Sequence, residues 1–510
     1  MTRNRTTIRG IACSLLGATL LASCASSDPA KIAGPAAPTA AVSKAATAFP
    51  LAAKGEDFNS QKLSAFAREN LKSFSTFTLS NGLPVIVKKN AANRVQHISL
   101  VIRGGVAAAS ADKAGIEALA LKTMARGSNK YSYEDIQALL DETSSGLGSA
   151  SSFDSSSYSL TTLDKYFSQI FPVWVDTIVE PAFKEADFDQ ELSNARMALE
   201  AKEQDPWQRT SLETDKILFE GHPYAVAPNG TKESLAAAKL DDVKAWYASR
   251  VCANELFIVA VGDFDAAALR QELEAGMGKL PASGEALPAS IGPVKKEGPG
   301  TLAKIEFPQS RGMGYLRGDF PAPAPSDPDY MALSIGMKTF SDLLFNIVRD
   351  KYGAAYTPNA TIRGFKANYG SIILFKTKIP GKAKAYIDEA AGLLATGKAV
   401  AIDPQSSKDG FSPLSDVLKA TKAQYINTLY ASQATNAAIA SSIASSVIST
   451  GDYRDYLLDV DRINAVTADQ VEAVVDKYLF KGTISWVALG SADVLVAAQP
   501  TDFEGFATPK

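Results

Sequence analysis

Histidine and cysteine are the most common ligands of catalytic zinc, and this chain of 510 residues has few of either. Its two histidines are His97 and His222, and Cys252 is the one cysteine beyond residue 24. A metallopeptidase helix needs two histidines four positions apart on one face. His97 and His222 cannot form such a pair, so the sequence predicts no metal ion held by this chain.

Other chemistry is poorly supported by the residue types. Serines are plentiful, but no Gly-x-Ser-x-Gly turn exposes a nucleophile, and no histidine is placed to act as its base. The formal net charge of −3 gives no electrostatic reason to bind nucleic acid. Peptides or proteins are therefore the expected partners.

An internal repeat indicates how the chain is organised. Residues 235–265 align without a gap to residues 463–493, each a helix with an Asp in its first turn, a short loop and a strand ending in glycine. The match falls at the end of both halves, so we infer a duplication. The predicted parts are a signal peptide at 1–23, a tether and N-terminal helix at 24–70, a first domain at 71–283, a linker at 284–302 and a second domain at 303–510.

The first half mixes strands and helices without regular alternation, which predicts an α+β fold. Asn81-Gly82 is typical of a hairpin turn, and Ser132 is expected to cap a helix that Gly146 ends. The pattern further predicts a buried strand at 95–105, an amphipathic helix at 114–128, one polar strand at 147–163 and helices at 166–179 and 187–207.

The N-terminal segment reads as a targeting signal. Three arginines precede a short apolar run that ends in "LASC", which resembles a bacterial lipobox. We therefore expect cleavage before Cys24 and lipidation of its side chain. Ala25 follows, with no aspartate to indicate retention at the inner membrane, so we favour a periplasmic protein anchored to the outer membrane. The alternative is an ordinary secretory signal with an incidental cysteine.

Five stretches, in this order, resemble the pitrilysin/insulinase family of zinc peptidases, the inverzincins: "LSNGLPVIV", "GGV…AGI…MARGS", "GLGSASSFDSSSYSL", "GHPYAVAPNGTKESL" and "VRDKYGAAY". Each stretch is weak alone, but their order and spacing are specific and extend over most of residues 74–495. The resemblance implies two homologous metallopeptidase-like α+β sandwich domains. Together they would form half of a clamshell chamber that admits short or unfolded peptides.

Family members that hydrolyse peptides carry H-x-x-E-H on the helix after the paired-glycine turn, two histidines to bind zinc and a glutamate to activate water. The corresponding positions here are Ala118, Leu121 and Lys122. A methyl or isobutyl group has no lone pair, and a lysine ammonium repels a divalent cation. The resemblance thus implies a degenerate zinc site and a non-catalytic member of the family.

The family's third zinc ligand is a glutamate on a later helix. Its place falls near Met197-Ala198, where there is again no carboxylate. Glu200 and Glu203 lie close in sequence, but beside Lys202 they fit a solvated helix face better than a metal site.

The second half keeps a different element of the family. Relatives place an arginine near the end of a helix and a tyrosine seven residues later, facing the zinc site; the matching residues are Arg349 and Tyr356. A phenol can stabilise an oxyanion, and a guanidinium can hold a carbonyl or carboxylate. Alternatively, Arg349 suits a helix C-terminus and Tyr356 is simply a strand residue. Leu343 replaces a family arginine, which is expected to weaken the grip on substrate.

The polar strand matches the family's substrate-side edge strand, to which an extended peptide can add as a further strand. The positions concerned are Gly148, Ser149, Ala150 and Ser151, with Ser149 where the family commonly has asparagine. The alternative is a serine-rich edge that only resists aggregation.

These observations favour a non-catalytic subunit of a heterodimeric periplasmic zinc peptidase. The chain itself would hold no cofactor and would not be an enzyme alone. A homologous partner subunit would hold the zinc, and both would act on a peptide substrate. The alternative hypothesis is a structural or peptide-binding lipoprotein scaffold with no role in hydrolysis.

Overall fold

The computed structural model describes residues 64–284, 287, 291–403 and 407–506. The predicted signal peptide, the predicted lipidation site at Cys24 and the part of the predicted tether up to residue 63 lie outside the described residues. All described residues belong to one compact unit, residues 45–510.

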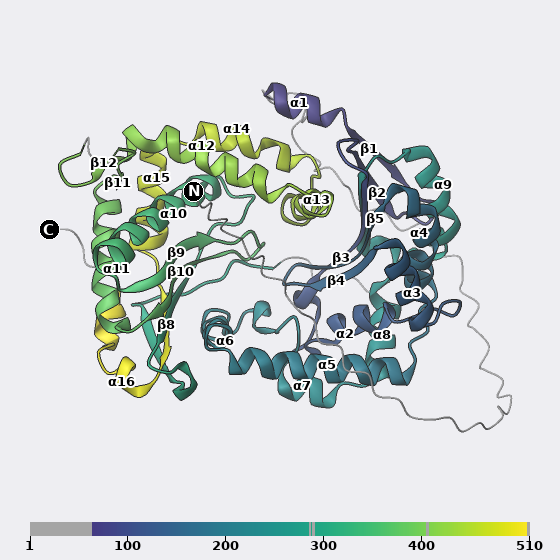
Figure 1. Cartoon of the computed structure of the whole chain (residues 1–510), viewed down its shortest axis with the longest axis horizontal. Helices are drawn as coiled ribbons and strands as arrows, with labels where there is room; N and C mark the ends of the chain where they lie inside the picture. The colour runs from purple at the N-terminus through teal and green to yellow at the C-terminus, as the bar shows by residue number, and fades with distance from the viewer. Residues whose placement is uncertain (1–63, 285–286, 288–290, 404–406, 507–510) are drawn as a thin grey trace, which may run out of the picture. The chain divides into compact units, whose positions relative to one another are not determined.

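The first half of this unit contains a six-stranded sheet in the order β1-β2-β6-β3-β5-β4 (Figure 1). β1 and β2 form the predicted hairpin, and Gly82 in its turn has φ of 93°, a left-handed conformation that favours glycine. β6 runs parallel to β2 and antiparallel to β3. The strands are β1 (Phe74–Thr78), β2 (Pro84–Lys89), β3 (Val95–Arg103), β4 (Gly146–Ser151), β5 (Ser155–Leu163) and β6 (Leu256–Gly262).

The described part of the first half contains nine α-helices. They are α1 (Ala65–Leu71), α2 (Ile116–Met124), α3 (Tyr133–Thr143), α4 (Asp164–Val179), α5 (Glu185–Gln204), α6 (Pro206–Leu218), α7 (Lys232–Ala237), α8 (Leu240–Arg250) and α9 (Ala266–Gly276). α2 begins later than predicted because Gly115 precedes it with φ of 83°, and it ends at Met124, before the predicted end at residue 128. Ser132 caps α3 as predicted, but the predicted end at Gly146 is wrong: Ser144 ends the helix in a left-handed conformation, and Gly146 begins β4.

The stretch predicted as one polar strand folds as two, β4 and β5, which pair antiparallel. The turn between them contains the buried Asp154. Its carboxylate accepts hydrogen bonds from the Tyr224 hydroxyl and, at 2.9 Å, from the backbone N–H of Lys366. Both partners are distant in sequence, so tertiary contacts fix a turn that the local pattern does not reveal.

Both faces of the first sheet are covered, which explains why its central strands read as continuous apolar runs. Successive residues alternate between two clusters: Val85 and Val87 pack towards α4 and α9, whereas Ile86 packs towards α13 (Asn436–Thr450). α13 comes from the second half of the chain and lies on the opposite side of the sheet from α4 and α9 (Figure 1).

The second half repeats this plan with a five-stranded sheet in the order β7-β13-β8-β10-β9. β13 is parallel to β7 and antiparallel to β8, as β6 is to β2 and β3. Matching the two sheets places β9 where β4 lies, at the outer edge. The strands are β7 (Thr301–Glu306), β8 (Gly314–Pro321), β9 (Ala355–Ile362), β10 (Tyr369–Thr377) and β13 (Ser485–Gly490), with a small separate pair β11 (Lys398–Val400) and β12 (Phe411–Pro413).

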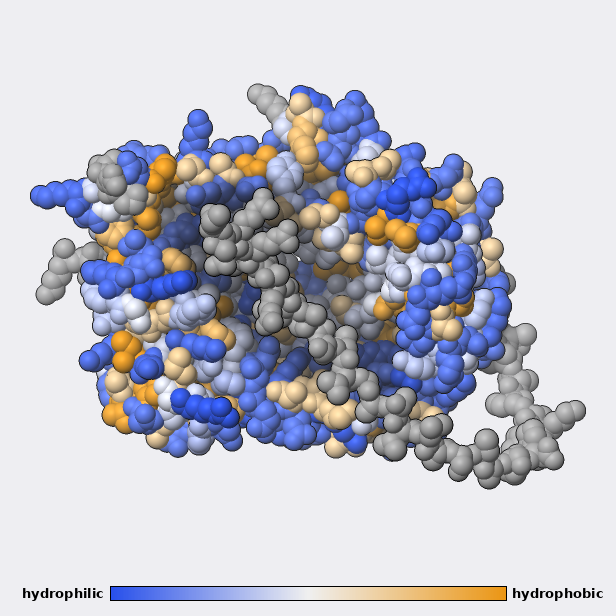
Figure 2. Space-filling model, in the orientation of Figure 1, coloured by the Kyte–Doolittle hydropathy of each residue, from blue (hydrophilic) through white to orange (hydrophobic). Residues whose placement is uncertain are grey.

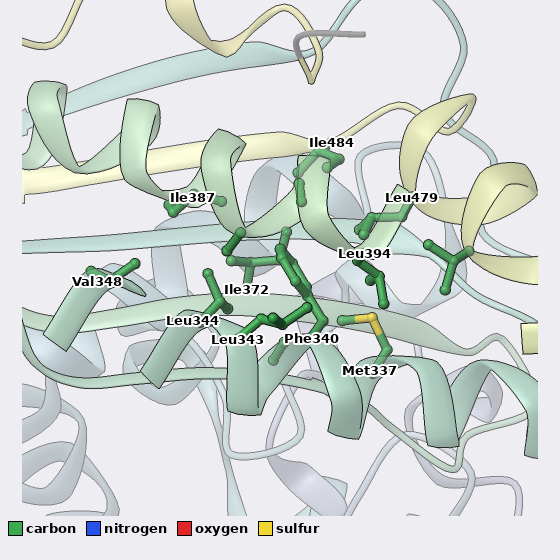
Figure 3. Packing of buried hydrophobic residues seen from close by; sticks show 14 of the residues in the cluster. Met337, Phe340, Leu343, Leu344, Val348, Ile372, Ile387, Leu394, Leu479 and Ile484 are labelled. Carbon is green, nitrogen blue, oxygen red and sulfur yellow. The ribbon is translucent and has the colours of Figure 1, made fainter. Parts of the chain in front are cut away.

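The core of the second half is built around α10 (Asp329–Leu344), which packs with α11 (Pro380–Ala395) (Figure 3). It also packs with α15 (Ala468–Val475). α10 continues into a π-helix, Phe345–Lys351. The continuous helix is apolar and long enough to cross a membrane, but 67% of its most apolar window is buried inside the protein. It is a core helix. The other helices are α12 (Leu414–Ser432), α14 (Asp459–Ala465) and α16 (Ala492–Leu495).

The two halves exchange one helix each. The order β4-β5-α4-α5-α6-α7-α8-β6 in the first half corresponds to β9-β10-α11-α12-α13-α14-α15-β13 in the second, so α6 and α13 are equivalent. α13 packs on β3 and β6, while α6 packs on β8 and β13. The outer surface in Figure 2 is mainly hydrophilic with scattered hydrophobic side chains, as expected when the exchanged helices bury both sheet faces.

Candidate functional site

The degenerate zinc-site positions lie on α2 and face the interior of the first half. Ala118 is 8% exposed and Leu121 is fully buried in the main core cluster, while Lys122 is half-buried. On α5, Met197 is 57% exposed. Within the described residues, no group of three or more His, Cys, Asp or Glu side chains is arranged to hold a metal. α2 is therefore helical at the predicted zinc-site positions, and Leu121 is part of the hydrophobic core.

Both histidines have structural partners. The buried His97 ring lies 2.8 Å, Nδ1 to Oγ1, from Thr161, and burial lowers the His97 pKa to about 4. His222 accepts a hydrogen bond on Nδ1 from the Tyr224 backbone N–H, so Nε2 carries the proton and donates it to the Gly292 carbonyl at 3.0 Å. Glu203 pairs with Lys232 and Glu200 is exposed, as expected for a solvated helix face.

Glu117, directly before Ala118, is a buried carboxyl that the sequence analysis did not single out. Its Oε1 is enclosed and has no hydrogen-bond partner among the described residues. Burial raises the Glu117 pKa to about 7, against the opposing effects of the Ser156 hydroxyl and the Arg250 charge. Glu117 also lines a cavity of about 390 Å³ between the start of α2 and α8. Its sequence neighbours give no sign of this, because the burial comes from α8 and β5.

The raised pKa of Glu117 predicts a pH-dependent stability. Between about pH 4.5 and about pH 7 the folded chain binds a proton that the unfolded chain has released, so the free energy of unfolding falls as pH rises through this window. We expect Glu117→Gln to remove on the order of 3 kcal/mol of this fall. Urea unfolding of both proteins at pH 4.5 and pH 8 measures it; parallel pH profiles would contradict the assignment.

The predicted peptide-binding residues lie on β4, the outermost strand of the first sheet. Gly148, Ser149 and Ala150 are exposed, and Ser151 is half-buried. No described strand pairs with the free side of β4. Its backbone N–H and C=O groups on that side are thus in place for an added strand.

Arg349 and Tyr356 are brought together. Arg349 lies in the π-helix and Tyr356 at the start of β9, with the guanidinium carbon 5.4 Å from the centre of the tyrosine ring. The same carbon is 4.5 Å from the Phe345 ring. Both rings are exposed, Tyr356 by 67% and Phe345 by 40%. Arg349 is exposed, its guanidinium lies against two aromatic rings, and no described residue is hydrogen-bonded to its N–H groups.

Phe345 was missed by sequence analysis, and Leu343 was misjudged. Phe345 precedes Arg349 by four positions, one turn of a helix, but its exposure depends on where α10 gives way to the π-helix. Leu343 is fully buried in the core of the second half (Figure 3). It lies at the end of α10, and its side chain packs into the core instead of facing a substrate.

Comparison with known proteins agrees with this architecture. The signature described as "Insulinase (Peptidase family M16)" matches residues 84–225, and that of the "Peptidase M16 inactive domain" matches residues 237–388. The chain belongs to the insulinase family, peptidase family M16. The resemblance drawn from the sequence is confirmed, as are the two M16-like α+β domains. The chain is an M16 member of the non-catalytic type, and the positions predicted to match the family's zinc-binding motif hold Ala118, Leu121 and Lys122.

Individual M16 relatives are distant. The chain is 26% identical over 181 residues to the "Non-peptidase homolog YmxG" of Helicobacter pylori, a match that covers 36% of this chain and 42% of YmxG. It is 22% identical over 478 residues to the "Mitochondrial-processing peptidase subunit beta" of Lentinula edodes, covering 85% of this chain and 96% of that subunit. The fold resembles the periplasmic protease PqqL of Escherichia coli with a TM-score of 0.66 at 16% identity, covering 84% of this chain and 46% of PqqL.

Proposed function

We propose that this chain is the zinc-less subunit of a heterodimeric periplasmic M16 peptidase. It binds an extended peptide along β4 and lends Arg349 and Tyr356 to the zinc site of a homologous partner subunit. The observation that carries the proposal is the exposed Arg349–Tyr356 pair, assembled in a chain whose own zinc positions hold Ala118, Leu121 and Lys122.

The exposure of the pair supports a role outside the fold itself. A tyrosine that is 67% exposed contributes little buried area to stability. The guanidinium nevertheless stacks over two rings, which limits its freedom and fixes its direction. Such an arrangement suits a group that must meet a substrate in one orientation.

The relatives support a divided enzyme. YmxG carries the name of a non-peptidase homolog, the Lentinula edodes relative is named as a subunit of a processing peptidase, and the chain covers about half of the protease PqqL. A second homologous chain would supply the remaining half and the zinc. No cofactor is proposed for this chain.

The site of action is proposed from the N-terminal segment. Three arginines, a short apolar run and "LASC" support export, lipidation of Cys24 and attachment to the outer membrane on its periplasmic side.

The test is a Tyr356→Phe variant in the complex copurified from the native envelope. Loss of an oxyanion donor is expected to lower kcat by about 100-fold with KM and zinc content almost unchanged. Tyr352→Phe is the matched control, because the Tyr352 ring is 40% exposed and stacks on Tyr386 instead of Arg349. Equal turnover in wild-type and Tyr356→Phe complexes would overturn the shared site.

A scaffold without a role in hydrolysis is the second candidate. The name of the relative YmxG, a non-peptidase homolog, favours it. A complex that binds peptide but whose turnover is unaffected by Tyr356→Phe would support this candidate.

A further inference from the structure

A second cavity, larger than the one lined by Glu117, lies in the second half of the chain. Its lining includes no residue of β4 or α2, and it does not include Arg349. Its volume is about 660 Å³, and it is lined by residues at the start of α10, at the end of α12, and on α13, α14 and α15. This volume is within the range of cavities that hold small molecules. The proposed function uses none of its residues.

The cavity has a counterpart in the first half. In the gapless repeat, Gln470, Ala473 and Val474 on α15 correspond to Asp242, Ala245 and Trp246 on α8, and both sets line cavities. The first-half cavity is about 390 Å³. Val474 in place of Trp246 removes an indole from the wall, which is one reason that the second cavity is the larger.

The lining carries an excess of negative charge. Four aspartates and one arginine line the cavity, and Asp329 is neutralised by Lys477, with Nζ 2.7 Å from Oδ2. Arg462 donates two hydrogen bonds to Asp455, at 2.8 and 2.6 Å. The same guanidinium is 3.8 Å from Asp459. One cation thus serves two carboxylates, and its bidentate bond is made to Asp455.

The fourth aspartate, Asp327, is exposed to solvent and accepts a hydrogen bond from the Asp329 backbone N–H at 2.8 Å. Asp459 is therefore the half-buried carboxylate left for a ligand. No described residue donates a hydrogen bond to its side chain; its one ion pair is the long contact with Arg462. Burial raises the Asp459 pKa to about 7, despite the attraction of Arg462. A second positive charge in the cavity would satisfy this carboxylate and reverse that effect.

The remaining wall suits a cation with hydrogen-bond donors. α13 presents serines at the cavity, among them Ser446, which is 7% exposed and whose hydroxyl is not hydrogen-bonded to any described residue. The rings of Tyr330 and Tyr456 also line it. Hydroxyl oxygens accept N–H bonds, and aromatic faces attract cations.

We propose that this cavity binds a primary ammonium group, with Asp459 as its counter-ion and Ser446 as a hydrogen-bonding partner. The ammonium belongs either to a free polyamine or to a lysine side chain of a peptide. Both sources present the same chemistry to Asp459, and the experiment separates them.

The test is calorimetric titration of the full chain with spermidine and with the tripeptide Lys-Gly-Gly. Tetraethylene glycol, of similar length but uncharged, is the control probe. At least one amine is expected to bind saturably and the glycol not at all. Binding of spermidine alone assigns the site to a free polyamine, and binding of the tripeptide alone to a peptide. Binding of neither amine, or equal binding of the glycol, overturns the proposal.

Two variants locate the binding. Asp459→Asn is expected to lower the affinity for the amine at least about tenfold. Asp416 is an exposed aspartate on α12, and Asp416→Asn is expected to leave this affinity unchanged. Val474→Trp restores the indole of the first repeat and is expected to exclude the ligand by volume. Thermal unfolding of each variant confirms that it is folded. Unchanged affinity in both Asp459→Asn and Val474→Trp places any amine binding elsewhere and overturns the proposal.

Discussion

Replacing Arg317 by methionine is expected to lower the free energy of unfolding by about 3 to 5 kcal/mol. Arg317 on β8 is 3% exposed and Asp319 is fully buried. The Nε of Arg317 donates to Asp319 at 2.9 Å, and its Nη2 lies 3.5 Å from Asp215 on α6. Methionine fills a similar volume but leaves the Asp319 charge buried without a partner.

A double variant separates the lost pair from the lost packing. Arg317→Met combined with Asp319→Leu removes both buried charges and is expected to cost much less than Arg317→Met alone, because a buried ion pair is often replaceable by apolar groups. Urea unfolding of the full chain measures both. If the double variant is as unstable as the single one, the loss comes from packing and the unpaired-charge explanation is wrong.

Introducing the family's glutamate at Leu121 is expected to destabilise the first half by about 3 kcal/mol or more. Leu121 is fully buried among apolar side chains, and a carboxylate there would lose both its hydration and the packing of the leucine. Leu121→Met is the control, with an expected cost below about 1.5 kcal/mol because volume and polarity are kept. Urea unfolding compares the two.

Adding both histidines, Ala118→His and Lys122→His, to the glutamate variant is not expected to restore a peptidase. The third-ligand position, Met197-Ala198 on α5, still offers no carboxylate. Two histidines alone leave the tetrahedral set of protein ligands incomplete. Metal analysis of the purified triple variant should find zinc far below one equivalent; stoichiometric zinc with peptide cleavage would show that the site needs only these three side chains.

The local pattern was sufficient where short-range chemistry decides the structure. Asn81-Gly82 made the β1–β2 turn predictable, and Ser132 did the same for the start of α3. The break between β4 and β5 was not predictable, because it depends on Asp154 reaching Tyr224 and a backbone group of the second half.

The residues of the candidate site likewise fall into those that the sequence made predictable and those that it did not. The spacing of Arg349 and Tyr356, read with the family resemblance, was enough to suggest that they meet. Phe345 was not predictable, because its contact with Arg349 depends on a π-helix that replaces the last turns of α10. Glu117 and Asp459 were missed because their altered pKa values come from burial by elements far away in the sequence.

The exchange of α6 and α13 bears on the origin of the chain. Each sheet is completed by a helix that belongs to the other repeat, so a single ancestral repeat would have left one hydrophobic sheet face bare. Two copies of that ancestor could have covered each other's faces as a symmetric dimer, each giving the same helix to its twin. Gene fusion then needed only a connecting segment between two subunits that already depended on one another.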